Sequence, residues 1–241
     1  MATEDTAILA GASGLIGGHL LRKLLDGGLY GRVIALVRRP LPEAHPRLTQ
    51  RTVSFDALPD DAFTGTGDVA GASGAPSGTS AGTIDVYCAL GTTMAKAGSQ
   101  QAFRKADHDA PLALAEHAVK AGARQFLLVS SVGADAESAT FYLRVKGELE
   151  RDIAALSLPT VHVFQPSLLL GDRKERRVGE AIGSVVARVA KGAMIGGLRK
   201  YRPVEADTVA RSMVAASRQS DPGRHTYHYD EITDLAARAW T

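Results

Sequence analysis

The chain of 241 residues has a single cysteine, Cys88, and lacks any apolar run long enough to span a bilayer. One cysteine excludes an intrachain disulfide and is typical of a reducing compartment. A membrane helix needs about 18 consecutive apolar residues, and the N-terminus lacks the pattern of a signal peptide. We therefore expect a cytoplasmic protein with no membrane partner. Because Cys88 lies inside an apolar run, it is expected to be a small core residue rather than a nucleophile.

Neither sign of charge is in marked excess. The 28 Lys and Arg residues and the 26 Asp and Glu residues leave a formal net charge of +2 at pH 7. Nucleic-acid-binding proteins carry blocks of Lys or Arg, often with aromatic residues between them, and the chain has neither. Its densest charged segment, residues 172–177, mixes both signs and is typical of a solvated loop. Nucleic acid is therefore not an expected partner.

Three catalytic patterns are also absent. The 7 histidines show no metal-ligand spacing such as His-Glu-x-x-His, so no metal site is expected. There is no Gly-x-Ser-x-Gly segment, which disfavours a hydrolase with a nucleophile elbow. The glycine-rich segment near the N-terminus lacks the Gly-Lys-Ser/Thr ending of nucleoside triphosphatases.

Strand-like and helix-like segments alternate along the chain. Residues 33–37 form one uninterrupted apolar run, as expected of a parallel strand buried on both faces. The alternation predicts an α/β fold, a Rossmann-like doubly wound parallel sheet in one domain of residues 1–241. Strands are predicted over 6–10, 33–37, 84–90, 125–129 and 160–164, with weaker ones over 51–55 and 225–229. Helices are predicted over 14–25, 103–121, 142–156, 176–191, 204–217 and 232–240.

Two segments depart from this alternation. Residues 64–83 are rich in Gly, Ser, Thr and Ala, and they cannot bury enough apolar surface to offset the entropy lost on ordering. They are expected to form a flexible surface insertion between two strands. By analogy with other sheets of this type, residues 171–241 are expected to form a smaller C-terminal part on the substrate side.

The most informative motif follows the first predicted strand. Glycines at positions 11, 14 and 17 stand between that apolar strand and a helix-like segment. Glycine lets the backbone turn tightly and approach a diphosphate, while the amide groups at the start of the helix attract the anion. This setting predicts a dinucleotide site rather than a turn that only links strand to helix. The residues expected at the cofactor are Gly11, Ser13, Gly14, Leu15, Ile16 and Gly17.

The end of the second predicted strand indicates which dinucleotide binds. Many NAD sites have a carboxylate at this point, which accepts a hydrogen bond from the adenosine ribose. Here the strand ends in Arg38 and Arg39, with no acidic residue. A guanidinium group can bind a 2′-phosphate through two hydrogen bonds, whereas a carboxylate would repel it. The pattern predicts NADP(H) in preference to NAD(H). The alternative is that both arginines only end a strand in solvent.

A second group of residues predicts proton-transfer chemistry. Tyr142 and Lys146 are four positions apart on a predicted helix and therefore share one face. A nearby ammonium group favours the phenolate form of a tyrosine, which makes the side chain useful as an acid and base. The serine pair Ser130 and Ser131 follows the preceding strand, where a hydroxyl group can bind the same substrate oxygen. The alternative is a tyrosine that packs in the core beside a lysine that reaches solvent.

Residues 90–93, 103–107, 130–135, 141–148 and 166–173 carry a resemblance to a known family. Over about residues 5–170 the chain resembles the short-chain dehydrogenase/reductases, a superfamily with an NAD(P)-binding Rossmann fold. Within them it is similar to the atypical members of the Tat-interacting-protein oxidoreductase subgroup. The resemblance implies that Ser131, Tyr142 and Lys146 are catalytic, and that Tyr142 and Lys146 also contact the cofactor. It further implies that Leu90, Gly91 and Thr92 line the cofactor, that Asp56 approaches the adenine, and that the backbone near Pro166 and Leu169 meets the carboxamide.

The chain departs from the family pattern at three points. Only 11 positions separate Ser131 from Tyr142, fewer than in most relatives. Gln165 stands where relatives often carry Arg, and Asp107 stands where many carry Asn. The small C-terminal part leaves little protein to enclose a nucleotide-sugar, which favours a small or exposed substrate.

Two functions are compatible with these features. The first is an NADP(H)-dependent oxidoreductase of the short-chain dehydrogenase/reductase type that acts on a small carbonyl or alcohol. The alternative is a non-catalytic NADP(H)-binding protein with a regulatory or redox-sensing role. The expected partner is a small-molecule substrate, and the resemblance makes a homodimer possible.

Overall fold

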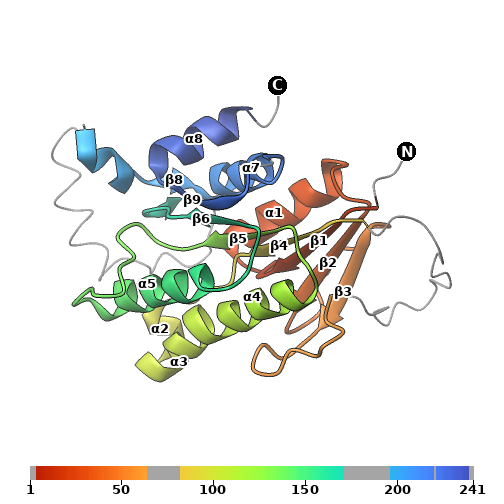
Figure 1. The fold of residues 1–241 in the computed structure, drawn as a ribbon, viewed down its shortest axis with the longest axis horizontal. Helices are drawn as coiled ribbons and strands as arrows, with labels where there is room; N and C mark the ends of the chain where they lie inside the picture. The colour runs from red at the N-terminus through yellow and green to blue at the C-terminus, as the bar shows by residue number, and fades with distance from the viewer. Residues whose placement is uncertain (1–3, 64–81, 171–195, 220, 239–241) are drawn as a thin grey trace.

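The computed structural model describes residues 4–63, 82–170, 196–219 and 221–238 (Figure 1). Within these ranges, parallel strands form a 7-stranded sheet in the order β3-β2-β1-β4-β5-β6-β9. The order reverses between β1 and β4, which confirms the predicted Rossmann-like doubly wound α/β fold. The strands are β1 Thr6–Ala10, β2 Arg32–Val37, β3 Leu48–Thr52, β4 Ile84–Cys88, β5 Gln125–Val129, β6 Thr160–Phe164 and β9 Gly223–Tyr227.

Helices cover both faces of the sheet (Figure 1). One face is covered by α1 Leu15–Asp26, α7 Ala206–Ala216 and α8 Tyr229–Arg238. The other is covered by α2 Met94–Ala97, α3 Gln100–Arg104, the π-helical segment η1 Lys105–Asp109, α4 Ala110–Lys120 and α5 Phe141–Ala154. A second, two-stranded sheet pairs β7 Leu169–Leu170 with β8 Val204–Glu205, and a 3-10 helix, η2, spans Gly196–Tyr201.

Alternating residues of each central strand supply two hydrophobic cores. In β1, Leu9 packs into the core beneath α1, α7 and α8, whereas Ile8 packs into the core beneath α4 and α5. Both side chains are fully buried. A parallel strand covered by helices on both faces reads as a continuous apolar run, because inward and outward positions are equally buried. This is why the central strands were recognisable in the sequence.

The predicted element bounds hold best in the centre of the sheet. Strands predicted over 6–10, 125–129 and 160–164 coincide with β1, β5 and β6. The strand predicted over 51–55 was misplaced: β3 spans Leu48–Thr52 and is a polar edge strand that pairs only with β2. The helix predicted over 103–121 is divided into three segments, α3, η1 and α4. It begins earlier than predicted, at Gln100, because Ser99 Oγ caps α3 by accepting a hydrogen bond from Ala102 N at 3.1 Å.

The C-terminal predictions were less accurate. The helix predicted over 204–217 begins at Ala206, because Val204–Glu205 pairs with β7. Strand β9 and helix α8 both begin before their predicted ranges of 225–229 and 232–240. The helix predicted over 176–191, and all but the last two residues of the predicted insertion over 64–83, lie outside the described residues.

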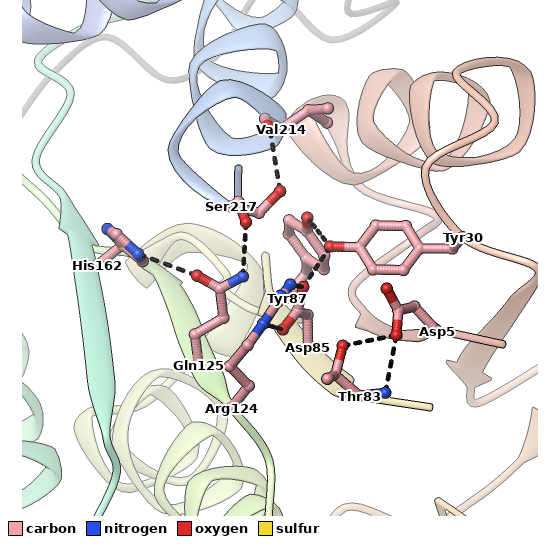
Figure 2. A network of polar contacts seen from close by, with 10 residues as sticks. All are labelled: Asp5, Tyr30, Thr83, Asp85, Tyr87, Arg124, Gln125, His162, Val214 and Ser217. Carbon is pink, nitrogen blue, oxygen red and sulfur yellow. Dashed lines mark hydrogen bonds and ion pairs between the residues drawn. The ribbon is translucent and has the colours of Figure 1, made fainter. Parts of the chain in front are cut away.

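A network of buried polar and charged side chains lies at the amino-terminal edge of the sheet (Figure 2). Asp85 at the start of β4 is fully buried and accepts hydrogen bonds from the Tyr30 hydroxyl at 2.6 Å and from Arg124 Nε at 3.0 Å. The Tyr30 and Tyr87 hydroxyl groups lie 2.7 Å apart. Burial raises the pKa of both phenols, so both remain protonated. The network joins β4, the start of β5 and the segment before β2, on the edge opposite the glycine loop.

A neutral histidine continues this polar layer. His162 is fully buried in β6, with Nε2 at 3.1 Å from Gln125 Oε1 and Nδ1 at 2.9 Å from the Tyr227 hydroxyl. Gln125 Nε2 in turn donates to the Ser217 carbonyl at 2.9 Å (Figure 2). Because an amide oxygen only accepts, Nε2 of His162 carries the proton. Burial, together with the nearby His225, lowers the pKa of His162 to about 4.

This histidine should make the fold sensitive to acid. Its folded pKa of about 4 lies below the ordinary value of 6.5, so the unfolded chain binds the proton first as the pH falls. The free energy of unfolding should therefore be highest above about pH 6.5, and His162 should remove up to about 3 kcal/mol of it as the pH falls toward 4. Urea unfolding at pH 7.5 and pH 4.5 measures this loss.

A matched pair of variants isolates the effect. His162→Gln should show a much smaller loss between the two pH values, because it removes the buried titrating group. His45 lies in a loop and is only half-buried, so the stability of His45→Gln should depend on pH as that of the unsubstituted protein does. An unchanged pH dependence in His162→Gln would contradict the assignment.

Candidate functional site

The predicted site residues lie mainly in loops at the carboxyl-terminal edge of the sheet. The loops after β1, β2, β4 and β5 leave this edge and carry the glycine motif, the two arginines, residues 90–92 and the serine pair. The gap between the loops after β1 and β4 is where the strand order reverses. In open α/β sheets, ligands bind at this switch point.

The glycine loop after β1 has a backbone that only glycine permits. Gly11 has φ +93°, and a Cβ atom there would lie 2.4 Å from the Ala89 carbonyl oxygen. A Cβ atom on Gly17 would lie 2.0 Å from the Gly11 carbonyl oxygen. Gly14 N donates a hydrogen bond to that same oxygen at 2.9 Å. The three glycines therefore bring the loop, the start of α1 and the loop after β4 into direct main-chain contact.

The start of α1 is open to an anion. Helix α1 begins at Leu15, and its N-cap, Gly14, has no side chain to accept a hydrogen bond from the first-turn amide groups. Ser13 and Gly14 are exposed, Leu15 is half-buried, and Ile16 is buried in the core. Free amide groups and the positive end of the helix dipole favour a phosphate here. The loop therefore fits the diphosphate of a dinucleotide.

The residues predicted for the adenosine end are exposed. Arg38 and Arg39 follow directly after β2, and both are exposed. Asp56, after β3, is also exposed, and its carboxylate lies 2.7 Å from Lys105 Nζ of η1. Asp56 is thus paired with a helix residue and not with another predicted cofactor residue.

Lys146 is held in a buried ion pair. Its Nζ atom lies 2.8 Å from Asp107 Oδ1, and Asp107 Oδ2 accepts a hydrogen bond from Thr92 N at 2.7 Å. Burial alone would lower the pKa of Lys146, but the Asp107 carboxylate and the nearby Tyr142 hold it above its ordinary value. The side chain is therefore a charged ammonium group. Asp107 was noted in the sequence only as a departure from the family pattern.

Tyr142 lies in the first turn of α5, one turn before Lys146. Its side chain is half-buried, and its ring centroid lies 5.5 Å from that of the fully buried Phe103. Phe103 also packs against Phe141 at 5.9 Å. The aromatic contact orients the tyrosine, and Tyr142 is close enough to Lys146 to influence its pKa. The structure thus brings together Tyr142 and Lys146, as the spacing predicted.

The two serines after β5 have different environments. Ser130 is buried, and its hydroxyl donates to Glu150 Oε1 at 2.5 Å. Ser131 is half-buried, and its hydroxyl makes only a long contact, 3.5 Å, to the Val132 carbonyl oxygen. Ser131 is therefore the serine with a hydroxyl that can turn toward a ligand, although in the described part of the chain it forms no hydrogen bond with Tyr142 or Lys146.

The short spacing between Ser131 and Tyr142 has a packing explanation. The connecting loop folds onto α5, where Asp135 N donates to the Leu143 carbonyl at 3.2 Å. A Cβ atom on Gly147 would lie 2.1 Å from the carbonyl carbon of Asp135. The loop can be short because a glycine on the helix lets its backbone approach directly.

Glu150 explains the glutamine found in place of arginine. Gln165 Nε2 lies 2.8 Å and 3.0 Å from the two carboxylate oxygens of Glu150, and Arg224 Nη2 of β9 lies 3.1 Å from Oε2. The guanidinium group thus comes from a different strand. Glu150 was not predicted, although its position one turn after Lys146 on α5 was a usable signal.

The remaining predicted residues lie around this centre. Leu90 and Thr92 are half-buried and Gly91 is exposed, in the loop after β4. Pro166 is buried, and its carbonyl accepts a hydrogen bond from Val132 N at 3.0 Å, whereas Leu169 is half-buried in β7.

Cys88 at the end of β4 is fully buried. Burial raises the pKa of its thiol to about 12, which agrees with a core role rather than a nucleophilic one. Within the described ranges, no three His, Cys, Asp or Glu side chains gather as metal ligands. In the same part of the chain, every helix is too short or too polar to cross a membrane.

Comparison with known proteins identifies the family. A family model described as NAD(P)H-binding matches residues 11–190, which is more than half of the chain. The chain belongs to the NAD(P)H-binding family. The matched region begins at Gly11 and includes the glycine loop, the ion pair and α5. The fold is of the NAD(P)-binding oxidoreductase type.

Individual relatives of this NAD(P)H-binding protein support the more specific resemblance. It is 34% identical over 214 residues to Protein HTATIP2 of Rattus norvegicus, covering 88% of this chain and 80% of that one. It is 32% identical over 208 residues to Protein fmp52, mitochondrial, of Aspergillus clavatus, covering 86% and 85%. The structure of human epimerase family protein SDR39U1 with NADPH has a TM-score of 0.55 at 18% identity, covering 92% of this chain and 74% of that one. The protein is an atypical short-chain dehydrogenase/reductase similar to HTATIP2.

The prediction of a cytoplasmic location is wrong. Several relatives of the NAD(P)H-binding protein, that of Aspergillus clavatus among them, are named mitochondrial. The prediction relied in part on the single cysteine. Few cysteines are typical of a reducing environment, but this feature does not separate one reducing compartment from another.

Proposed function

We propose that this protein is an NADP(H)-dependent oxidoreductase that acts on a small carbonyl or alcohol. The observation that carries the proposal is the buried Lys146 ammonium one turn from the half-buried Tyr142, at the sheet edge that also holds the glycine loop. A phenol beside an ammonium group can act as an acid and a base, because the positive charge favours its phenolate form. A dinucleotide and a proton donor at one edge are the components of carbonyl reduction.

Each residue has a distinct role in this proposal. When bound, the nicotinamide supplies or accepts a hydride. The Tyr142 hydroxyl donates a proton to the substrate oxygen during reduction and accepts it during oxidation. Lys146 keeps positive charge beside that hydroxyl, and Ser131 orients the substrate oxygen by a hydrogen bond. The loop of Gly11 to Gly17 binds the diphosphate through main-chain amide groups.

The preference for NADP(H) over NAD(H) rests on Arg38 and Arg39. Replacing both with alanine should weaken NADPH binding by about 10- to 100-fold, because charge-assisted hydrogen bonds contribute roughly 1.5–3 kcal/mol. NADH binding should change by less than about twofold, since NADH has no 2′-phosphate. Fluorescence titration of both cofactors measures the effect. Arg218→Ala is the control, because this exposed arginine lies near Gln125 at the opposite edge of the sheet.

Turnover decides between the enzyme and the sensor. Purified protein should bind NADPH and oxidise it in the presence of at least one member of a panel of small aldehydes and ketones. Binding without turnover across the panel would overturn the proposed reductase in favour of the redox-sensing alternative. No binding of either cofactor would overturn both.

A further inference from the structure

Asp107 joins two parts of the site that are far apart in the sequence. It lies in the π-helical segment η1, and its side chain and that of Lys146 are 1% and 5% exposed. One carboxylate oxygen, Oδ2, accepts the hydrogen bond from Thr92 N. The other, Oδ1, lies 2.8 Å from Lys146 Nζ and has no further partner among the described residues. The carboxylate therefore links the loop after β4 to the ammonium group on α5.

The ion pair lies close to the main chain of the loop after β4. Gly91 lies over it: a Cβ atom there would be 3.3 Å from Asp107 Oδ1 and 3.9 Å from Lys146 Nζ. Gly91 itself is exposed, while the pair beneath it is buried. A ligand against the loop of residues 90–92 would thus approach the charges closely, with little solvent to screen them.

We propose that Asp107 is a positioning residue: it holds the Lys146 ammonium beneath the loop of residues 90–92 and offsets its charge, and so sets the pH range in which Tyr142 works. This inference deepens the proposed function and rests on it.

A lone ammonium group and an ion pair would act differently on Tyr142. A lone ammonium beside Tyr142 would strongly favour the phenolate form. A carboxylate 2.8 Å from that ammonium makes the pair neutral overall, so the tyrosine experiences much less positive charge. The other ionisable group that influences Lys146 is Cys88, which stays a neutral thiol because burial raises its pKa to about 12. Asp107 therefore carries the negative charge that offsets the Lys146 ammonium group.

Neighbouring ion pairs do not supply a substitute charge. Arg104 pairs with Glu148, and His108 Nε2 lies 3.0 Å from Asp152 Oδ2. Both contacts join α3 or η1 to α5 on either side of the Asp107 contact, and His108 Nδ1 also lies 2.8 Å from Asp109 Oδ1. Among the described residues, none of these carboxylates forms an ion pair with Lys146. A substitution at Asp107 would therefore leave Lys146 with an unbalanced charge.

Asp107→Asn tests the proposal with little change in shape. Asparagine can still accept the hydrogen bond from Thr92 N, but it carries no charge. In the NADPH-dependent reaction, the midpoint of the pH–rate limb at high pH should fall by about one unit or more. This direction holds whether the proton leaves the tyrosine or the lysine, because both ionise more readily without the carboxylate. Asp85→Asn, at a buried carboxylate on the opposite edge, should lower stability and leave the limb in place.

A second readout does not depend on activity. In Asp107→Asn the buried ammonium has lost its partner, so the pKa of Lys146 should fall and folding should require a neutral amine. The melting temperature of the variant should therefore lie further below that of the unsubstituted protein at pH 7 than at pH 10. A melting-temperature difference independent of pH, or an unchanged pH–rate limb in an active variant, would overturn the proposal.

Two further outcomes keep the conclusions separate. If Asp107→Asn does not fold, adding Lys146→Met should restore folded protein, because it removes the unpaired charge. A double variant that is equally unfolded would overturn the positioning role and assign Asp107 to the fold alone. If the unsubstituted protein shows no turnover, the proposed reductase fails, and the pH dependence of the melting temperatures then decides the role of Asp107.

Discussion

Replacing Gly17 with alanine should weaken NADPH binding by at least about 100-fold, whereas the same substitution at Gly18 should change it by less than about twofold. A Cβ atom on Gly17 would lie 2.0 Å from the Gly11 carbonyl oxygen and 2.6 Å from its carbon. These are main-chain atoms, which cannot rotate away as a flexible side chain would. Helix α1 must therefore move off the glycine loop, and the amide groups that bind the diphosphate move with it.

Gly18 is the matched control because it is the next residue of the same helix. Its Cβ atom would meet nothing closer than the Ala12 carbonyl oxygen at 3.6 Å, an ordinary van der Waals contact. Alanine favours a helix over glycine by about 1 kcal/mol, so Gly18→Ala should raise the free energy of unfolding by roughly 0.5–1 kcal/mol. Gly17→Ala should instead lower it by about 1–3 kcal/mol through overpacking.

Fluorescence titration with NADPH and urea unfolding separate the two effects. Gly17→Ala should lose affinity even under conditions where it is fully folded. Equal affinities for the two alanine variants would show that the contact between Gly17 and Gly11 does not shape the cofactor site. They would also remove the main structural argument for a diphosphate at this loop.

The parts of the fold that were predictable share a physical cause. Central strands such as β1 and β5 are buried on both faces, so each is a short apolar run that stands out from its neighbours. Strand β3 has one strand neighbour, β2, and its sequence, Leu-Thr-Gln-Arg-Thr, is polar. Its position depends on pairing with β2, which a local pattern does not record.

In the candidate site, too, only local features could be predicted from the sequence. The glycine motif and the Tyr142–Lys146 spacing are local, and the structure places both at the same sheet edge. The partner of Lys146 is not local: Asp107 lies on another element, and the contact exists only once η1 packs on α5. The two serines were also indistinguishable in sequence, because only the fold places Ser130 against Glu150 and leaves Ser131 without a strong hydrogen bond.

Replacing Tyr142 with phenylalanine should reduce kcat by about 10²- to 10⁴-fold, because a positioned general acid contributes a rate factor of that size. The aromatic contact with Phe103 remains available to a phenylalanine ring, so the free energy of unfolding should change little. NADPH affinity should stay within about twofold, since the diphosphate and adenosine contacts of the proposal lie elsewhere. Steady-state kinetics with saturating NADPH measure the loss.

Tyr30→Phe provides the opposite result with the same chemical change. The Tyr30 hydroxyl donates to the buried Asp85 carboxylate at 2.6 Å, so its removal leaves a buried charge less well satisfied. That variant should lose about 1–3 kcal/mol of stability and keep kcat, because Tyr30 lies just before β2, at the amino-terminal edge of the sheet. The free energy of unfolding and kcat together then show that the Tyr30 hydroxyl stabilises the fold and the Tyr142 hydroxyl takes part in the reaction. If Tyr142→Phe kept full kcat, the proton would have to come from another group or from solvent, and Tyr142 would be left with a packing role against Phe103.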